Sequence, residues 1–287
     1  MPLSAARPTA QAAAASGGAS RPLLVRRVDL ATGVSLPYAE AGAPDGVPVV
    51  FLHGVIDSWH SFATVLPQLP PAVRALALTQ RGHGDASRPA GAYDMGSFAA
   101  DLAAFLDALG VRSAVLVGHS MGATVAQRFA VDYPQRTRGL VLIGSFARFA
   151  TNPGLMEFHR TTIATLTDPV PAAVVREFQE STLAGPIDHA FLEHMIAEGS
   201  KPPAHVWRAA FEGMLADAHA DRLDRITAPT LLLWGELDAF VPRSDQDALR
   251  TAIRGARLSV YRGIGHAVHW EAPARVAADI AAHAAAC

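Results

Sequence analysis

Five short apolar runs, separated by stretches with helical spacing, most constrain what this chain can fold into. The runs lie at 48–52, 73–79, 113–118, 139–144 and 229–235. They are continuously apolar rather than alternating, which is typical of strands buried on both faces. Repeated strand and helix patterns favour helices on both faces of a sheet. The sequence therefore predicts an α/β fold with a mainly parallel central sheet.

The two ends of the chain fit the same arrangement. Residues 25–30 and 34–40 predict two strands joined around Thr32 and Gly33, an antiparallel hairpin at a sheet edge. We expect helices over 97–109 and from Trp59 to about Leu66. Near the end of the chain we expect a helix at 245–253, a strand at 257–261 and an Ala-rich helix at 273–283.

The strand pattern stops in the middle of the chain. From Phe146 to about Ala216 the sequence holds only helical stretches interrupted by prolines, with many Phe and Met residues. Such a block between two strands of one sheet predicts an inserted, all-helical lid. The expected organisation is a disordered Ala-rich tail at 1–21, a core formed by 22–145 and 217–287, and the lid at 146–216.

The bulk composition excludes several classes of protein. Half of the 287 residues are hydrophobic and 17% are charged. The formal net charge is −2, so the chain lacks the excess of basic residues that is typical of nucleic-acid-binding proteins. No apolar run reaches the roughly 18 residues that span a bilayer. The one cysteine, Cys287, excludes an internal disulfide. We therefore expect a soluble, cytoplasmic protein.

A Gly-x-Ser-x-Gly pattern lies where the run at 113–118 ends. A sharp turn from strand to helix strains the serine and brings backbones together, so Gly118 and Gly122 avoid Cβ clashes. This turn would raise the Ser120 hydroxyl above the sheet, beside the positive end of a helix. The alternative is that Ser120 only caps the helix.

Further reactive side chains follow the later predicted strands. Glu236 and Asp238 follow the run at 229–235, and His266 follows the strand expected at 257–261. Because ligands bind at the carboxyl ends of parallel strands, a serine, an acid and a histidine should meet there. Imidazole can deprotonate a hydroxyl while a carboxylate fixes its tautomer. His269, three residues after His266, more readily fits a packing role.

These linked motifs resemble the α/β-hydrolase family over nearly the whole chain from Leu23. The resemblance rests on five motifs: His53-Gly54, Arg81-Gly82-His83-Gly84-x-x-Ser87, Gly118-His119-Ser120-Met121-Gly122, Gly235-x-x-Asp238-x-x-x-Pro242 and Gly265-His266. It implies a serine esterase-like member in which Ser120 is the nucleophile, Asp238 the acid and His266 the general base. It also implies an oxyanion hole made by the backbone N–H groups of Val55 and Met121.

The pocket is harder to predict than the reaction. Residues from the core loops and the lid are candidates for its lining because they are aromatic, Met or His near the expected site. They are His53, Trp59, His119, Phe146, Phe149, Met156, Phe211 and Phe240. We expect no metal, because His189 and His194 are five residues apart and no His-Glu-x-x-His occurs. We also expect no cofactor.

The expected activity is cleavage of carboxylic esters or lactones with an apolar acyl or aryl part, through an acyl-enzyme. A serine at position 120 disfavours epoxide hydrolases and haloalkane dehalogenases of the family, which use aspartate there. Carbon–carbon bond hydrolysis on the same triad is an alternative, although hydrolases of that kind in the family usually carry Asn where His119 stands. Cofactor-free haloperoxidase or perhydrolase activity, which uses the same triad, is an alternative, as is a non-catalytic ligand receptor. The expected partner is a small molecule; the sequence does not indicate an oligomeric state.

Overall fold

The computed structural model describes residues 23–287, so the tail expected at 1–21 lies outside the described residues. The described chain contains an eight-stranded sheet in the order β1-β2-β4-β3-β5-β6-β7-β8. The strands are β1 (Leu24–Asp29), β2 (Ser35–Ala41), β3 (Val47–Leu52), β4 (Val73–Leu78), β5 (Ala114–His119), β6 (Thr137–Ile143), β7 (Thr230–Gly235) and β8 (Arg257–Tyr261).

The strand directions match the sequence pattern. β1 and β2 form an antiparallel hairpin at one edge, and β2 also pairs antiparallel with β4. All pairs from β4 through β3, β5, β6 and β7 to β8 are parallel. The predicted α/β fold with a mainly parallel sheet is therefore confirmed.

Burial of both faces explains why the strands are continuously apolar. In β3, Val50 and Leu52 belong to one buried cluster, whereas Val49 and Phe51 belong to a second cluster on the opposite face. Neighbouring side chains of a strand point to opposite faces, so both must be apolar when helices cover both.

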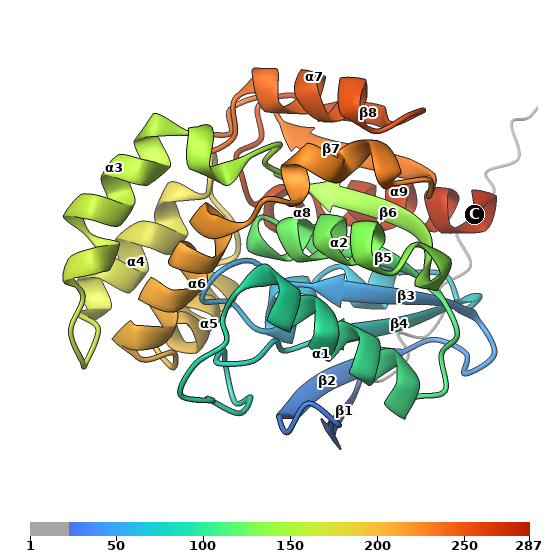
Figure 1. Cartoon of the computed structure of the whole chain (residues 1–287), viewed down its shortest axis with the longest axis horizontal. Coiled ribbons are helices and arrows are strands. Elements are labelled where there is room, and N and C mark those ends of the chain that lie inside the picture. The colour runs from blue at the N-terminus through green and yellow to red at the C-terminus, as the bar shows by residue number, and fades with distance from the viewer. Residues whose placement is uncertain (1–22) are drawn as a thin grey trace, which may run out of the picture.

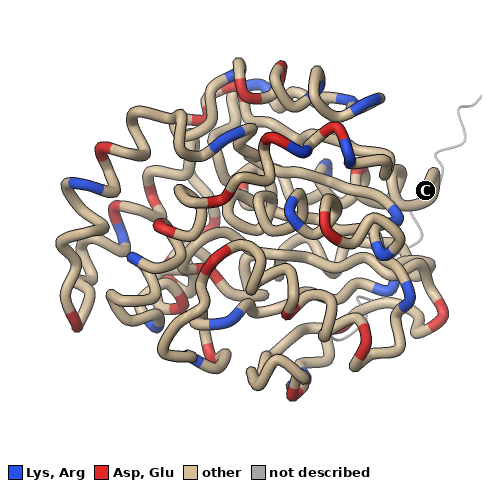
Figure 2. The backbone as a smooth tube through the Cα atoms, viewed as in Figure 1, with Lys and Arg blue, Asp and Glu red and all other residues tan. Residues whose placement is uncertain are grey.

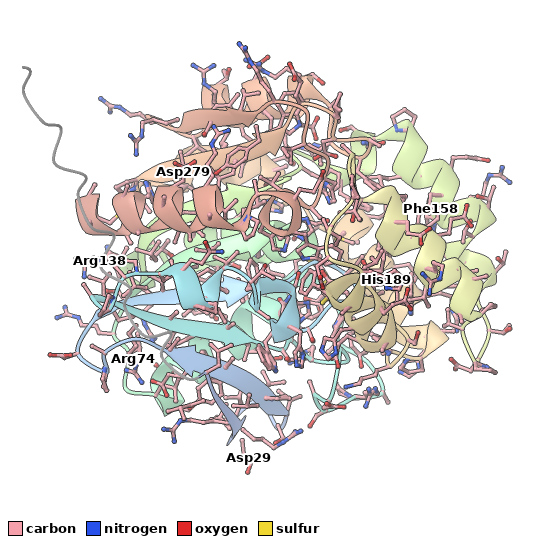
Figure 3. All side chains as sticks on the ribbon, turned by 180° about the vertical axis from the view of Figure 1, so that it is seen from behind. Asp29, Arg74, Arg138, Phe158, His189 and Asp279 are labelled. Carbon is pink, nitrogen blue, oxygen red and sulfur yellow. The ribbon has the colours of Figure 1, made fainter. Side chains whose placement is uncertain are left out.

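Helices cover the two faces of the sheet (Figure 1). Residues of α1 (Met95–Ala108), α2 (Met121–Asp132) and α7 (Arg243–Ala252) join the first cluster. Residues of α8 (Val268–Glu271) and α9 (Pro273–Ala286) join the second. Seen from behind in Figure 3, α9 lies across the sheet, and its Asp279 accepts a hydrogen bond of 2.7 Å from the Tyr261 hydroxyl.

A helical insert lies beyond the carboxyl ends of the strands (left in Figure 1). It connects β6 to β7 and contains α3 (Pro153–Thr161), α4 (Ala172–Ser181), α5 (His189–Gly199) and α6 (Ala204–Ala216). Short 3-10 turns, η4 (Phe149–Thr151), η5 (Ile163–Thr165) and η6 (His219–Arg225), join these helices to one another and to the sheet. This insert, which we call the lid, covers the edge where the polar strand ends converge.

One predicted element is wrong. The helix expected from Trp59 to about Leu66 is replaced by two 3-10 turns, η1 (Trp59–Phe62) and η2 (Leu66–Gln68). The Ser58 side chain accepts from the His60 N–H and starts the first turn. Pro67 lacks an N–H and disfavours helical backbone before it, so a regular helix cannot continue.

The charged residues of the described chain are scattered. Basic and acidic positions are interspersed over the helices, loops and sheet edges rather than gathered by sign (Figure 2). Among residues 23–287, no helix has the length and apolar character needed to cross a bilayer.

Candidate active site

The turn at Ser120 has the strain that its glycines indicate. Ser120 lies between β5 and α2 with φ of 52° and ψ of −115°, a conformation that non-glycine residues rarely adopt. A Cβ on Gly118 would lie 2.3 Å from the Gly122 carbonyl oxygen, and one on Gly122 would lie 2.1 Å from that of Leu52. The Ser120 side chain makes no capping hydrogen bond to α2, so the alternative role as a helix cap is not realised.

Asp238 and His266, which follow β7 and β8, form a buried pair. Asp238 follows β7, and its Oδ1 accepts from the backbone N–H groups of Phe240 and Val241, each at 2.9 Å. Its Oδ2 lies 2.9 Å from His266 Nδ1. Because an ionised carboxylate only accepts, Nδ1 must carry the hydrogen, which leaves Nε2 free to take a proton.

The other candidate acid and base lie apart from this pair. Glu236 accepts from the Gly263 N–H at an exposed turn. His269 is fully buried, with Nε2 2.9 Å from Ser61 Oγ, and burial lowers its pKa to about 3. His269 therefore stays neutral inside the protein, in the packing role expected for it.

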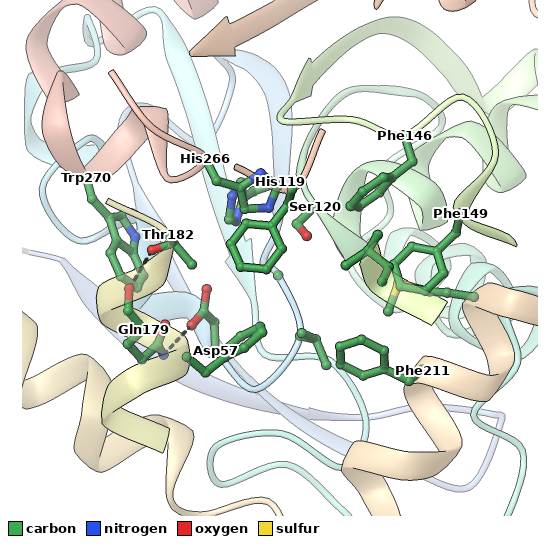
Figure 4. Close-up of a pocket in the computed structure, with 16 residues that line it drawn as sticks. Asp57, His119, Ser120, Phe146, Phe149, Gln179, Thr182, Phe211, His266 and Trp270 are labelled. Atoms are coloured by element: carbon green, nitrogen blue, oxygen red, sulfur yellow. Dashed lines mark hydrogen bonds between the residues drawn. The ribbon is translucent and has the colours of Figure 1, made fainter. Parts of the chain in front are cut away.

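Ser120 and His266 line one pocket (Figure 4). No hydrogen bond joins the Ser120 hydroxyl to the His266 ring among the described residues. Such contacts are often long without substrate and tighten in the reacting complex. A ligand bound in this pocket would lie beside both side chains.

The two predicted oxyanion donors lie in the loop after β3 and at the start of α2. In the described turns, the N–H of Asp57 bonds the Gly54 carbonyl and that of Ser120 bonds the Ile143 carbonyl, whereas those of Val55 and Met121 have no backbone partner. Met121 is the first residue of α2, where N–H groups lack intrahelical acceptors. The next residue after Val55 is strained, because the β-branched Ile56 has a φ of 66°.

His119 forms the back of the pocket and is neutral. Its ring centroid lies 4.8 Å from that of His266 and 4.4 Å from that of His269. Neither of its nitrogens has a hydrogen-bond partner among the described residues. Burial and the two neighbouring imidazoles lower its pKa well below the usual value, so it contributes no positive charge to the pocket.

The pocket is narrow and mostly apolar, and it lies between the strand ends and the lid. Five predicted residues line it: His119, Phe146, Phe149, Phe211 and Phe240. The aromatic rings contact one another, with Phe149 and Phe211 centroids 5.7 Å apart. This lining suits an apolar acyl or aryl group.

Three predicted lining residues lie elsewhere, which corrects the sequence prediction. His53 is buried beneath the pocket; its Nε2 accepts from the Gln80 N–H, so Nδ1 is the atom that donates to the Gly54 carbonyl. Trp59 lies in η1 and borders a separate surface hollow. Met156 faces outward with 50% of its surface exposed, because Leu155 occupies the inward side of α3.

Sequence reasoning missed several lining residues. They are Asp57, Leu155, Phe178, Gln179, Thr182, Met214 and Trp270. The sequence does hold a signal for Asp57, because this acidic residue lies two residues after Val55, the predicted oxyanion donor. The contribution of Gln179 depends on how α4 docks against the core, which no sequence spacing reveals.

One cluster of side chains outside the pocket has metal-ligand chemistry. Ligand atoms of His60, His194 and Glu198 lie within 4.8 Å of one another. The Lys201 ammonium already lies 2.7 Å from Glu198 Oε1 and neutralises that carboxylate. His189 does not join this cluster with His194. Its Nε2 lies 3.9 Å from Glu193 Oε1.

The fold, and the order in which Ser120, Asp238 and His266 follow strands of the sheet, agree with a known protein family. The alpha/beta hydrolase fold family model matches residues 47–273. Because this match covers most of the chain, the protein belongs to the α/β-hydrolase fold family, as the motifs suggest.

Relatives within the family differ in their activities. The chain is 33% identical to a non-heme chloroperoxidase of Streptomyces lividans, over 83% of this chain and 92% of that protein. It is 30% identical to a 2-hydroxy-6-oxo-2,4-heptadienoate hydrolase of Pseudomonas putida, over 86% and 91%. Its structure resembles that of an esterase from Rhodococcus sp. ECU1013, with a TM-score of 0.76, 26% identity and coverage of 91% and 98%. The protein is thus a hydrolase-type member of a family whose relatives carry out different reactions.

Proposed function

We propose that this protein is a serine hydrolase that cleaves carboxylic esters or lactones with an apolar acyl or aryl part. The observation that carries the proposal is that Ser120, in its strained turn, shares a pocket with His266, whose Nδ1 is paired with the buried Asp238 carboxylate. The aromatic lining supports the apolar substrate class.

The proposed reaction has two halves. Ser120 Oγ attacks the ester carbonyl carbon while His266 Nε2 takes the hydroxyl proton, and the Val55 and Met121 N–H groups stabilise the oxyanion. The tetrahedral intermediate collapses by breaking the bond to the alkoxy oxygen, and His266 returns the proton to the departing alcohol. Water, deprotonated by His266, then attacks the acyl-enzyme and releases the acid and the free serine.

The charge of the pocket favours neutral esters over carbon–carbon bond hydrolysis. The Pseudomonas putida relative is named for a heptadienoate, which carries a carboxylate. Among the described residues that line the pocket, none is Lys or Arg, and Asp57 adds an acidic group. An anionic substrate would lose its hydration there without gaining a counter-charge.

Perhydrolysis is the second candidate, supported by the similarity to the Streptomyces lividans chloroperoxidase. Hydrogen peroxide would replace water in the second half-reaction, giving a peracid and free Ser120. Peracid formation from an acyl ester and hydrogen peroxide, compared with hydrolysis by the same preparation, measures the ratio of the two activities.

A fluorophosphonate probe tests the proposal, because it labels only activated serines. We expect labelling of the wild type on the peptide that contains Ser120 and none in Ser120→Ala. Ser145→Ala is a matched control, since Ser145 also follows a strand but is buried against Gln127. A folded wild type that neither takes up the probe nor hydrolyses any member of an ester and lactone panel would overturn the proposal.

A further inference from the structure

The pocket contains a buried carboxyl group that the proposed reaction does not use. Asp57 lies in the loop after β3, is only 3% exposed and lines the same pocket as Ser120. Its Oδ1 accepts from Gln179 Nε2 at 2.9 Å, and its Oδ2 accepts from Ser61 Oγ at 3.0 Å. Gln179 belongs to lid helix α4, so the carboxyl lies at the junction of core and lid.

This carboxyl lies beside the proposed oxyanion loop. A Cβ placed on Gly54 would be 3.4 Å from Asp57 Oδ2 and 2.9 Å from His119 Nδ1, so both groups border the same backbone. Figure 4 shows Asp57 and Gln179 on the opposite side of the pocket from the rings of Phe149 and Phe211. The pocket therefore has an aromatic wall and a polar wall, with Ser120 and His266 between them.

The polar wall has more acceptor capacity than the protein uses. A carboxylate offers about four lone-pair positions, and the two side-chain donors named above occupy only part of them. Burial raises the pKa of Asp57 to about 7, and the surrounding hydrogen bonds and His266 only partly oppose this effect. A ligand donor that reached the carboxyl would offset its lost hydration, whereas a ligand carboxylate would be repelled.

We propose that Asp57 recognises a hydroxyl or amino group a few bonds from the scissile carbonyl. The preferred substrates are then aryl esters or lactones that carry such a donor beside the carbonyl. The aryl part contacts the aromatic wall, and the donor bonds Asp57. The inference rests on the proposed ester hydrolysis and makes Asp57 a specificity-determining residue that is not required for bond cleavage.

A matched pair of esters tests this assignment. The methyl ester of mandelic acid carries a hydroxyl beside the carbonyl, and its analogue has methyl in that position. The ratio of kcat/KM for the hydroxyl ester to that for the methyl analogue is measured in wild type and in Asp57→Asn. Comparing the two ratios cancels the intrinsic reactivity of each ester. We expect the ratio to fall about tenfold in Asp57→Asn, as for the loss of one charge-assisted hydrogen bond.

Controls separate the subsite from other effects. If Asp57→Asn does not fold, Asp57→Ser is measured in the same way, since its smaller side chain cannot collide with the Gln179 amide. Gln179→Met removes a competing donor but keeps the carboxyl, so the preference for the hydroxyl ester should persist. If a folded Asp57 variant hydrolyses both esters with the wild-type ratio of kcat/KM, the role of Asp57 in recognising the donor group is overturned, whereas the proposed ester hydrolysis is not. Failure of wild type to hydrolyse any ester would instead count against the proposed function.

Discussion

The floor and the roof of the pocket are built by different means. The floor consists of strand ends, where backbone conformation and buried hydrogen bonds hold Ser120, Asp238 and His266. The roof is the lid, where rings such as Phe178 and Trp207, with centroids 5.6 Å apart, contact one another from separate helices. The difference implies that floor substitutions should act on kcat and roof substitutions on substrate choice.

The largest expected effect comes from the nucleophile. Ser120→Ala should lower kcat for ester hydrolysis by about 10⁵-fold, because the substitution removes the proposed nucleophile that forms the acyl-enzyme. Steady-state kinetics with a chromogenic aryl ester measure the change, and an unaltered melting temperature shows that the fold is retained. Activity within about tenfold of wild type would mean that the reaction does not pass through Ser120.

The acid of the floor should have the next largest effect. Asp238→Asn should lower kcat by about 10³- to 10⁴-fold, because an amide no longer holds the Nδ1–H tautomer of His266. Glu236→Gln is the matched control and should leave kcat close to wild type, since Glu236 only accepts from Gly263 at the surface. The opposite pattern in the two variants would make Glu236 the acid.

Replacing Asp57 should also have a smaller effect, on the pH dependence of the free energy of unfolding. The folded pKa of Asp57 is raised from 3.8 to about 7, so between these values the folded state binds a proton that the unfolded state has lost. Stability supplied by this group is present in acid and decreases as the pH rises. Unfolding free energies of wild type minus Asp57→Asn should fall by about 2 kcal/mol from about pH 5 to about pH 7.5.

Urea denaturation at several pH values provides this comparison. The groups around Asp57 in the folded state are Gln179, Ser61, His266 and Glu198. They are retained in the variant, so their own titration largely cancels in the difference. A difference that stays constant or rises with pH would contradict the raised pKa of the buried Asp57 carboxyl.

The smallest expected effect belongs to the roof. Phe211→Leu should raise KM for aryl esters about fivefold and change kcat by less than about twofold, because the lost ring contact contributes to binding in both ground and transition states. An alkyl ester of similar size should show little change. Met156→Leu is the control, because Met156 lies on the same lid but faces outward.

Much of the floor is predictable from sequence because it depends on local backbone chemistry. The glycines around Ser120 and the apolar runs of the strands indicate the turn and the sheet directly. The roof is less predictable, because composition does not reveal which side of a helix faces inward. Leu155 and Met156 are adjacent, yet only Leu155 lines the pocket. The Asp57–Gln179 contact joins residues 122 apart and exists only after the lid docks.

The most direct test of the central claim is to trap the acyl-enzyme. Wild-type protein is mixed with an activated aryl ester, quenched in acid during the first turnover, digested and measured by mass spectrometry. The account predicts about one acyl group per chain, on the peptide that contains Ser120. Turnover of the ester with no adduct, accompanied by equal activity in Ser120→Ala, would contradict it.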